Sequence, residues 1–187
     1  EIDGIHMHRV KGVYPEGDAY LKVRAASSRL RNGVVLDTCT GLGYTAIWAV
    51  RLGASSVITV EKDINVLKIA EVNPWSWDLE SEKITIVNDD ASRLIYSIPS
   101  EAFQAVIHDP PRFSLAGELY SGVFYSELFR ILRPRGVLVH YVGRPGEKSR
   151  GLRLYRGVVE RLRAAGFEAR WNPEQRVVIA YKRRIGT

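Results

Sequence analysis

The sequence predicts an α/β domain whose centre is a seven-stranded, mostly parallel sheet with a C-terminal antiparallel hairpin. Three observations support this fold class. Short apolar runs alternate along the chain with segments whose apolar residues recur at helical spacing. A turn with two glycines joins the first apolar run to the helical segment that follows it. The last two apolar runs are joined by a short turn, Asn172 to Gln175, with no helix between them.

Residues 1–32 precede the first strand, and we interpret them as an N-terminal lid segment followed by a helix. Asp18 is expected to cap a helix over residues 18–31. His6 and His8 are two positions apart, and this spacing would place both side chains on one side of a strand. Because no cysteine or acidic cluster lies near them in the sequence, we predict no metal site. A surface loop and a lid that faces a substrate are both compatible with the first residues.

Residues 33–187 form the principal domain, in which strands and helices alternate. The first expected strand, residues 34–36, is a continuous apolar run, and further strands are expected over residues 57–60, 84–87, 103–108, 137–142, 167–171 and 177–182. Helical spacing predicts helices over residues 44–52, 64–72, 91–96, 122–132 and 153–165. Glycine or an Asn-Pro pair follows several of these helices and is expected to end them. Strands separated by helices run parallel, with helices on both faces of the sheet.

The composition fits one globular domain with a basic surface. No apolar run among the 187 residues approaches the roughly 20 that a membrane-spanning helix needs. The net charge of +6 suggests a polyanionic partner such as nucleic acid, and a generic soluble surface is the alternative. Cys39 is the single cysteine, which excludes an internal disulfide and fits a reducing, cytoplasmic location. The chain begins at Glu1 rather than at Met, so we leave open whether further residues precede it.

Acidic residues close four of the expected strands: Asp37, Glu61, Asp90 and Asp109. The carboxyl ends of parallel strands share one edge of the sheet, and ligands bind there in open α/β sheets. Acids at such positions also cap helices, but four of them on successive strands favour a binding edge. The basic loop over residues 143–151 follows the fifth strand, and we interpret it as facing the substrate.

The glycine turn narrows the class of ligand. Gly41-x-Gly43-x-x-Ala46 fits the glycine fingerprint of dinucleotide-binding proteins. Glu61 follows this turn at about the distance in the chain at which such proteins have an acidic residue that binds the ribose. Asp37, however, lies beside the turn, where its negative charge would repel a pyrophosphate. A ligand that carries a cationic sulfonium and an ammonium group has no such penalty.

From Gly33 to Lys182 the chain resembles the class I S-adenosylmethionine-dependent methyltransferases, which have a Rossmann-like fold. The resemblance implies that the methionine end of S-adenosylmethionine is held by Asp37, Thr38, Cys39, Thr40, Gly41 and Gly43. It also implies a cofactor contact at Lys62 and a bond from Glu61 to both ribose hydroxyls. The family usually has glycine where Cys39 stands, so Cys39 is either a small packing residue or a cofactor contact.

For the adenine end, the resemblance implies that Asp90, followed by Ala91, accepts a hydrogen bond from the adenine amino group. Asp89 is the alternative if the register differs by one residue. Residues 33–187 are therefore expected to be the methyltransferase domain.

A second motif, Asp109-Pro110-Pro111-Arg112-Phe113, follows the fourth expected strand. It resembles the Asp-Pro-Pro-Tyr motif of methyltransferases that act on exocyclic amino groups of bases. Such an amine is a poor nucleophile because its lone pair is delocalised. Asp109 and the Pro110 carbonyl would accept its two N–H groups, and proline holds that carbonyl rigidly. Termination of the strand by the prolines is the alternative.

Arg112 stands where the resembled motif has an aromatic residue. It can stack through its guanidinium or bind phosphate, and Phe113 can supply a ring one position later. The other rings that we consider for base stacking are Tyr14, Tyr141 and Trp171, although core packing also explains each. The run from His108 to Gly117 is similar to a group of predicted archaeal methyltransferases.

The sequence therefore predicts S-adenosylmethionine-dependent N-methylation of an exocyclic amino group of a base in ribosomal or transfer RNA. Unpaired RNA bases suit a small basic domain that has no evident module for reading duplex DNA. One alternative is methyl or aminopropyl transfer to a small-molecule amine. A non-catalytic RNA-binding module is a second alternative. Neither a metal nor a membrane is an expected partner, and the oligomeric state is left open.

Overall fold

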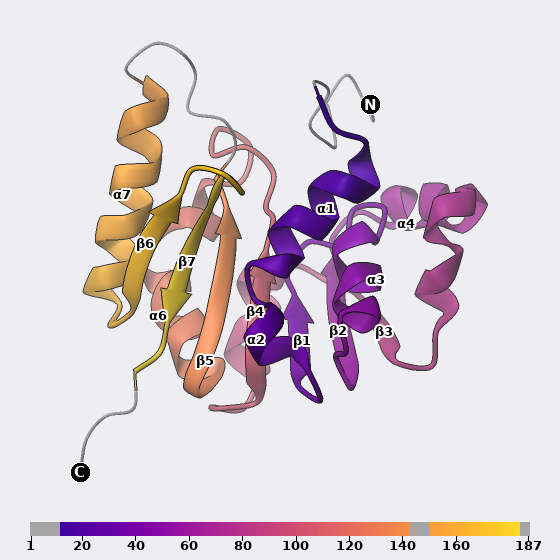
Figure 1. The fold of residues 1–187 in the computed structure, drawn as a ribbon, viewed down its shortest axis with the longest axis horizontal. Coiled ribbons are helices and arrows are strands. Elements are labelled where there is room, and N and C mark those ends of the chain that lie inside the picture. Colours follow the sequence, from indigo (N-terminus) through magenta and orange to yellow (C-terminus); the bar gives the residue numbers. More distant parts are fainter. Residues whose placement is uncertain (1–11, 143–149, 184–187) are drawn as a thin grey trace.

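The computed structural model describes residues 12–142 and 150–183, and its centre is one seven-stranded sheet (Figure 1). The strands are β1 (Val34–Asp37), β2 (Ser56–Glu61), β3 (Ile84–Asn88), β4 (Phe103–His108), β5 (Leu132–Tyr141), β6 (Glu168–Asn172) and β7 (Val177–Tyr181). Their order across the sheet is β3-β2-β1-β4-β5-β7-β6. The pairs from β3 to β5 are parallel, and β7 pairs antiparallel with both β5 and β6. The predicted sheet and its C-terminal hairpin are confirmed.

Helices cover both faces of this sheet (Figure 1). The α-helices are α1 (Pro15–Arg24), α2 (Ser27–Leu30), α3 (Tyr44–Arg51), α4 (Ile64–Val72), α5 (Ala91–Leu94), α6 (Gly122–Ile131) and α7 (Arg150–Ala164). Alternate residues of β1 point to opposite faces, so Val35 joins Leu30 and Ile47 in one apolar cluster. Leu36 joins Leu128 of α6 in the other cluster. These two clusters form the core and hold the strand ends in fixed positions.

The first helix differs from its prediction. It begins at Pro15, whose ring suits the first helical position, and its N-cap is Tyr14. Asp18 therefore lies inside α1 and does not cap it, so that expectation was wrong. The predicted helix over residues 18–31 is also two helices, because the chain leaves α1 at Ala25 and starts α2 at Ser27.

Three short 3₁₀ helices, η1 (Pro74–Glu80), η2 (Ile95–Ser97) and η3 (Gly117–Tyr120), were not predicted. Of these, η1 and η3 lie in connections that the sequence pattern left without structure, and η2 continues α5. Both η1 and η3 support the strand ends described below. None of the described helices is long and apolar enough to cross a membrane. His6, His8 and residues 143–149 of the predicted basic loop lie outside the described residues.

The register of the sheet aligns the carboxyl ends of its central strands. Asp37 at the end of β1 lies opposite Thr59 of β2 and Ile107 of β4. Glu61 at the end of β2 lies opposite Asn88 of β3. The strand order reverses between β1 and β4, and ligands bind at such a switch point. The segments that follow β1, β2, β3 and β4 are therefore neighbours at one edge of the sheet.

Candidate functional site

Asp37 is completely buried at the end of β1. Its Oδ2 atom accepts hydrogen bonds from the hydroxyls of Thr45 and Thr59, each at 2.9 Å. Its Oδ1 atom has no hydrogen-bond partner among the described residues. Burial raises the pKa of Asp37 to about 7, although the two threonine hydroxyls favour the ionised form. Asp37 thus ties the start of α3 to β2 and keeps one acceptor atom unused.

The loop after β1 is fixed by its own backbone. Gly43 has a φ of 83° and is the N-cap of α3, a conformation that favours glycine. A Cβ atom at this position would overlap the side chain of Leu79 in η1. The Ser76 hydroxyl of η1 also donates to the Leu42 carbonyl at 2.7 Å. The 3₁₀ helix η1 therefore supports the glycine loop from behind.

Thr38 connects this loop to the segment after β4. The Thr38 N–H donates to the Ile107 carbonyl, and the Thr38 hydroxyl lies 2.6 Å from Nδ1 of His108. Burial lowers the pKa of His108 to about 4, so its ring is neutral near pH 7. Nε2 of His108 donates to the Leu119 carbonyl at 3.0 Å, which leaves Nδ1 to accept from Thr38. The predicted cofactor loop and the predicted acceptor motif are thus joined through two buried side chains.

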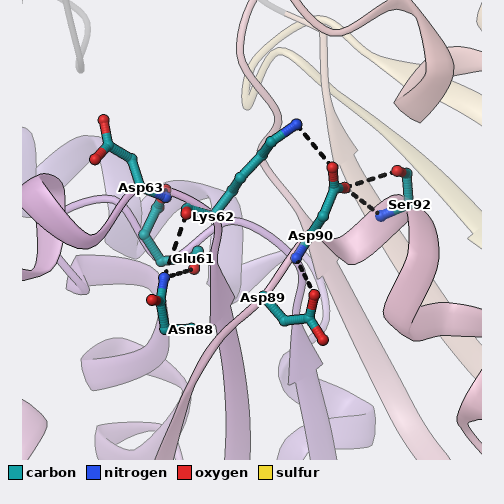
Figure 2. Close-up of polar contacts among 7 residues, drawn as sticks. All are labelled: Glu61, Lys62, Asp63, Asn88, Asp89, Asp90 and Ser92. Carbon is teal, nitrogen blue, oxygen red and sulfur yellow. Dashed lines mark hydrogen bonds and ion pairs between the residues drawn. The ribbon is translucent and has the colours of Figure 1, made fainter.

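Glu61 reaches from β2 to the same loop. Its Oε2 atom accepts the Gly41 N–H at 2.9 Å, and Oε1 accepts the Asp63 N–H at 3.0 Å. Figure 2 shows that the Asn88 amide also anchors this strand end by donating to the Glu61 carbonyl, at 2.7 Å. Since a carboxylate offers about four acceptor positions, Glu61 retains capacity for two further donors.

Lys62 and Asp90 form an ion pair above the ends of β2 and β3 (Figure 2), with 2.7 Å between Nζ and Oδ2. Asp90 also caps α5, because its Oδ1 atom accepts the Ser92 N–H at 2.9 Å. Partial burial alone would raise the pKa of Asp90, but hydrogen bonds from Lys62 and Ser92 lower it to about 2. Asp89 is exposed, and its Oδ1 atom accepts a hydrogen bond from the Asp90 N–H. Ala91 is the first residue of α5. The cap interpretation thus holds for Asp90, which is also within reach of a ligand at this edge.

Asp109 follows β4 and forms an ion pair that the sequence did not reveal. The Lys22 ammonium of α1 lies 2.7 Å from its Oδ2 atom and 2.9 Å from Oδ2 of Asp18. The same ammonium lies 3.7 Å from the centre of the Tyr141 ring on β5. The Lys22 and Asp18 side chains are each 7% exposed, and the Asp109 side chain is 22% exposed. Helix α1 is therefore part of the predicted acceptor site.

The rest of the motif lies nearer the surface. Pro110 is buried, Pro111 is exposed, and the Pro111 carbonyl accepts the Tyr120 hydroxyl of η3 at 2.9 Å. Phe113 is 50% exposed, and its ring meets that of Tyr120 edge-on at 5.4 Å. Arg112 is exposed, and within the described part of the chain its guanidinium makes no ion pair. The structure thus presents a cation and a ring beside Asp109.

The other aromatic candidates have different surroundings. Trp171 stacks on Tyr155 of α7 with the ring centres 4.9 Å apart, which is a packing role. Tyr14 is 87% exposed at the start of α1. The Tyr141 ring makes a cation–π contact with the Lys22 ammonium.

Sequence reasoning missed five residues, whose partners lie between 8 and 87 residues away in the chain. Lys22, Thr45, Thr59, His108 and Tyr120 each position a predicted site residue. His108 directly precedes Asp109, and Thr45 lies two residues beyond Gly43, so their proximity to the motifs was a usable signal. Lys22 gave no such signal, because 87 residues separate it from Asp109.

The residues present fit S-adenosylmethionine on chemical grounds. Glu61 and Asp90 offer acceptor oxygens to hydroxyl and amino donors, and Asp37 has an unused buried acceptor atom. A cationic ligand next to Asp37 would favour its ionised form. No cluster of three or more metal-ligating side chains occurs among residues 12–142 and 150–183.

Comparison with known proteins gives a family match and several relatives. The family model described as Conserved hypothetical protein 95 matches residues 21–140. An archaeal relative, the uncharacterized protein MJ1233 of Methanocaldococcus jannaschii, is 54% identical over 167 residues, which are 89% of this chain and 57% of that protein. Polyamine aminopropyltransferase of Mycobacterium tuberculosis is 30% identical over 152 residues, or 76% of this chain and 28% of that enzyme. Ribosomal RNA large subunit methyltransferase I of Photobacterium profundum is 31% identical over 127 residues, or 63% of this chain and 32% of that enzyme.

Two solved structures show the same fold. Spermidine synthase in complex with the transition-state analogue AdoDATO aligns with a TM-score of 0.73 at 16% identity, over 88% of this chain and 60% of that chain. A protein from Listeria monocytogenes described as an S-adenosylmethionine-dependent methyltransferase aligns with a TM-score of 0.66 at 14% identity, over 89% and 99% of the two chains. The predicted Rossmann-like methyltransferase fold is confirmed.

Proposed function

This chain belongs to the Conserved hypothetical protein 95 family, and we propose that it is an S-adenosylmethionine-dependent methyltransferase. We propose further that it methylates an exocyclic amino group of a base in RNA, either ribosomal or transfer RNA. One observation carries the proposal. The β1–β4 pairing and the Thr38–His108 hydrogen bond place the glycine loop directly beside Asp109. The proposed donor site and the proposed acceptor site are thereby neighbours.

On the donor side, the proposal assigns the methionine end of the cofactor to the loop from Thr38 to Gly43 and to Asp37. The ribose hydroxyls are assigned to Glu61, and the adenine amino group to Asp90. When bound, S-adenosylmethionine supplies an electrophilic methyl group on a sulfonium. The role proposed for Asp37 is electrostatic, because its carboxylate favours the positive charge that this donor carries.

On the acceptor side, Asp109 accepts one N–H of the amine, and the Pro110 carbonyl accepts the other. These bonds turn the nitrogen lone pair toward the methyl carbon. With the cofactor bound, the new N–C bond would form as the C–S bond to the methyl carbon breaks, and the proton of the methylated amine would pass to solvent. Alignment of two reactants can contribute about 7–11 kcal/mol to such a reaction. The protein therefore acts mainly by holding the amine in line.

Three observations support RNA as the substrate. The net charge is +6, which favours a polyanion. Arg112 and Phe113 are exposed beside Asp109, where they can contact a phosphate and stack on a base. A relative that shares 31% identity over 127 residues acts on ribosomal RNA, according to its name.

Aminopropyl transfer to a polyamine is the second candidate, because an aminopropyltransferase is 30% identical over 152 residues. Polyamines are protonated at neutral pH and need uncompensated acidic groups. Here the Lys22 ammonium lies 2.7 Å from the Asp109 carboxylate and 2.9 Å from the Asp18 carboxylate, so it offsets one of the two negative charges. Asp109 therefore attracts a cationic polyamine less than an unpaired carboxylate would.

The test is transfer of a tritiated methyl group from S-adenosylmethionine to total RNA from a strain that lacks this gene, followed by nucleoside mass spectrometry. We expect one N-methylated nucleoside with the wild-type protein. Asp109→Ala should reduce the rate by about 10²–10⁴-fold, since it removes the group that orients the amine. Binding of S-adenosylhomocysteine should stay within about threefold of wild type, because the donor side is untouched.

Glu118→Ala is the matched control, because it removes an exposed carboxylate on η3 near the same motif. Parallel reactions with putrescine or spermidine and decarboxylated S-adenosylmethionine test the second candidate. Cofactor binding without label in any RNA would contradict methylation of RNA. Product formation with a polyamine would establish the second candidate instead.

A further inference from the structure

The Lys22 ammonium occupies an unusual place for a charged group. It lies 2.7 Å from Asp109, 2.9 Å from Asp18 and 3.7 Å from the centre of the Tyr141 ring. These three contacts come from β4, α1 and β5, so they fix the ammonium from three sides. Only 7% of the Lys22 side chain is exposed.

Stability alone is a weak reason for this arrangement. Removing an ammonium from water is costly, and buried ion pairs often contribute little net stability compared with apolar residues. Burial alone would lower the pKa of Lys22, but the charges of Asp109 and Asp18 raise it above its ordinary value. Lys22 is therefore a permanent cation against the side of Asp109.

The two carboxylate oxygens of Asp109 have different hydrogen-bond partners. Oδ2 accepts from Lys22, and within the described residues Oδ1 accepts no hydrogen bond. A bond from Lys22 fixes the rotation of the carboxylate and leaves Oδ1 free for an incoming donor. The other ionisable groups that interact with Asp109 among the described residues are Asp18 of α1, Asp37 of β1, Cys39 of the glycine loop, Tyr120 of η3 and Tyr141 of β5.

We propose that Lys22 is a positioning residue of the acceptor site, which holds the Asp109 carboxylate so that Oδ1 faces the amine. This inference rests on the proposed methyl transfer and adds a residue from α1 to it. Asp109 therefore acts as a hydrogen-bond acceptor that orients the amine.

The test compares methyl transfer to RNA by Lys22→Met and Lys22→Arg with transfer by the wild-type protein. Lys22→Met keeps the volume and removes the charge. We expect kcat to fall at least tenfold, while KM for S-adenosylmethionine changes less than about twofold. Lys22→Arg, which keeps a cation, should recover part of the loss. Lys68→Met is the control, because Lys68 is exposed on α4.

Asp18→Asn combined with Lys22→Met removes the buried aspartate charge that the single variant leaves unpaired. This second variant should fold and show the same loss of kcat. In an Asp109→Ala background, Lys22→Met should cause no further loss, since Lys22 acts through Asp109.

Two results overturn the inference while methyl transfer stands: an unchanged kcat in folded Lys22→Met, or losses that multiply in the double variant with Asp109→Ala. A wild-type protein that binds the cofactor and methylates no RNA overturns the proposed function, and the role of Lys22 with it.

Discussion

The four strand-end acids differ in what holds them, although they look equivalent in the sequence. Asp37 is completely buried and bonded by two threonines, and Asp90 caps α5 and pairs with Lys62. Glu61 accepts a hydrogen bond from the Gly41 N–H, and Asp109 forms an ion pair with Lys22. At the scale of single residues, Asp109, Glu61 and Asp37 each keep an acceptor position unused among the described residues, whereas both oxygens of Asp90 already accept hydrogen bonds.

Asp37 should make the free energy of unfolding depend on pH. Its pKa is about 7 in the folded protein and 3.8 in an ordinary carboxyl group, so the folded state binds the proton more tightly. Its contribution to stability is complete below about pH 4 and is lost as pH rises through 7. The loss is on the order of 4 kcal/mol. Urea unfolding between pH 4 and 8 measures it.

Asp37→Asn is the matching variant, because it keeps an acceptor for Thr45 and Thr59 and does not titrate. We expect it to lose this part of the pH dependence and to be at least as stable as wild type at pH 8. An equal slope in wild type and variant would show that Asp37 is ionised in the folded protein throughout this range.

At the scale of elements, the glycine loop depends on η1. Leu79 packs where a side chain on residue 43 would have to lie, and Ser76 bonds the Leu42 carbonyl. The short helix η1 therefore sets the path of the chain from β1 into α3. Since α3 carries Thr45, the same contact positions the partner of Asp37.

Gly43→Ala should destabilise this element. The alanine must adopt a φ of 83° and displace Leu79, which together cost about 2–4 kcal/mol. Gly122→Ala is the matched control, since nothing lies within 4 Å of a Cβ atom there; it should change stability by less than about 1 kcal/mol. Urea unfolding measures both, and equal stability of the two variants would contradict the role given to Leu79.

The strands and most helices were predictable because their signals are local. Runs rich in apolar residues mark most of the strands, and Asn172 and Gln175 close the hairpin with hydrogen bonds to each other. The start of α1 was misjudged because Asp18 competes with Pro15 as a helix-start signal, and Pro15 prevails. The ion pair of Lys22 with Asp109 was not predictable, because it is set by the packing of α1 onto the sheet and not by any sequence spacing.

At the scale of the whole molecule, the strand order brings the proposed donor site and the proposed acceptor site to one edge of the sheet. The segments after β1, β2 and β3 supply the proposed donor site, and the segment after β4, with α1, supplies the proposed acceptor site. All the cofactor and acceptor contacts remain predictions, those at Thr38, Cys39, Lys62, Asp89 and Ala91 included, as does the division of the chain at residue 32. The basic charge of the chain is consistent with a polyanionic substrate at this edge.

The most direct test of this account is a crystal structure of the protein with bound S-adenosylhomocysteine. We predict ribose hydroxyls on Glu61, the adenine amino group on Asp90, and a sulfur atom that faces Asp109 across the glycine loop. A ligand bound elsewhere, or a sulfur atom on the far side of the loop from Asp109, would contradict the proposed arrangement of donor and acceptor.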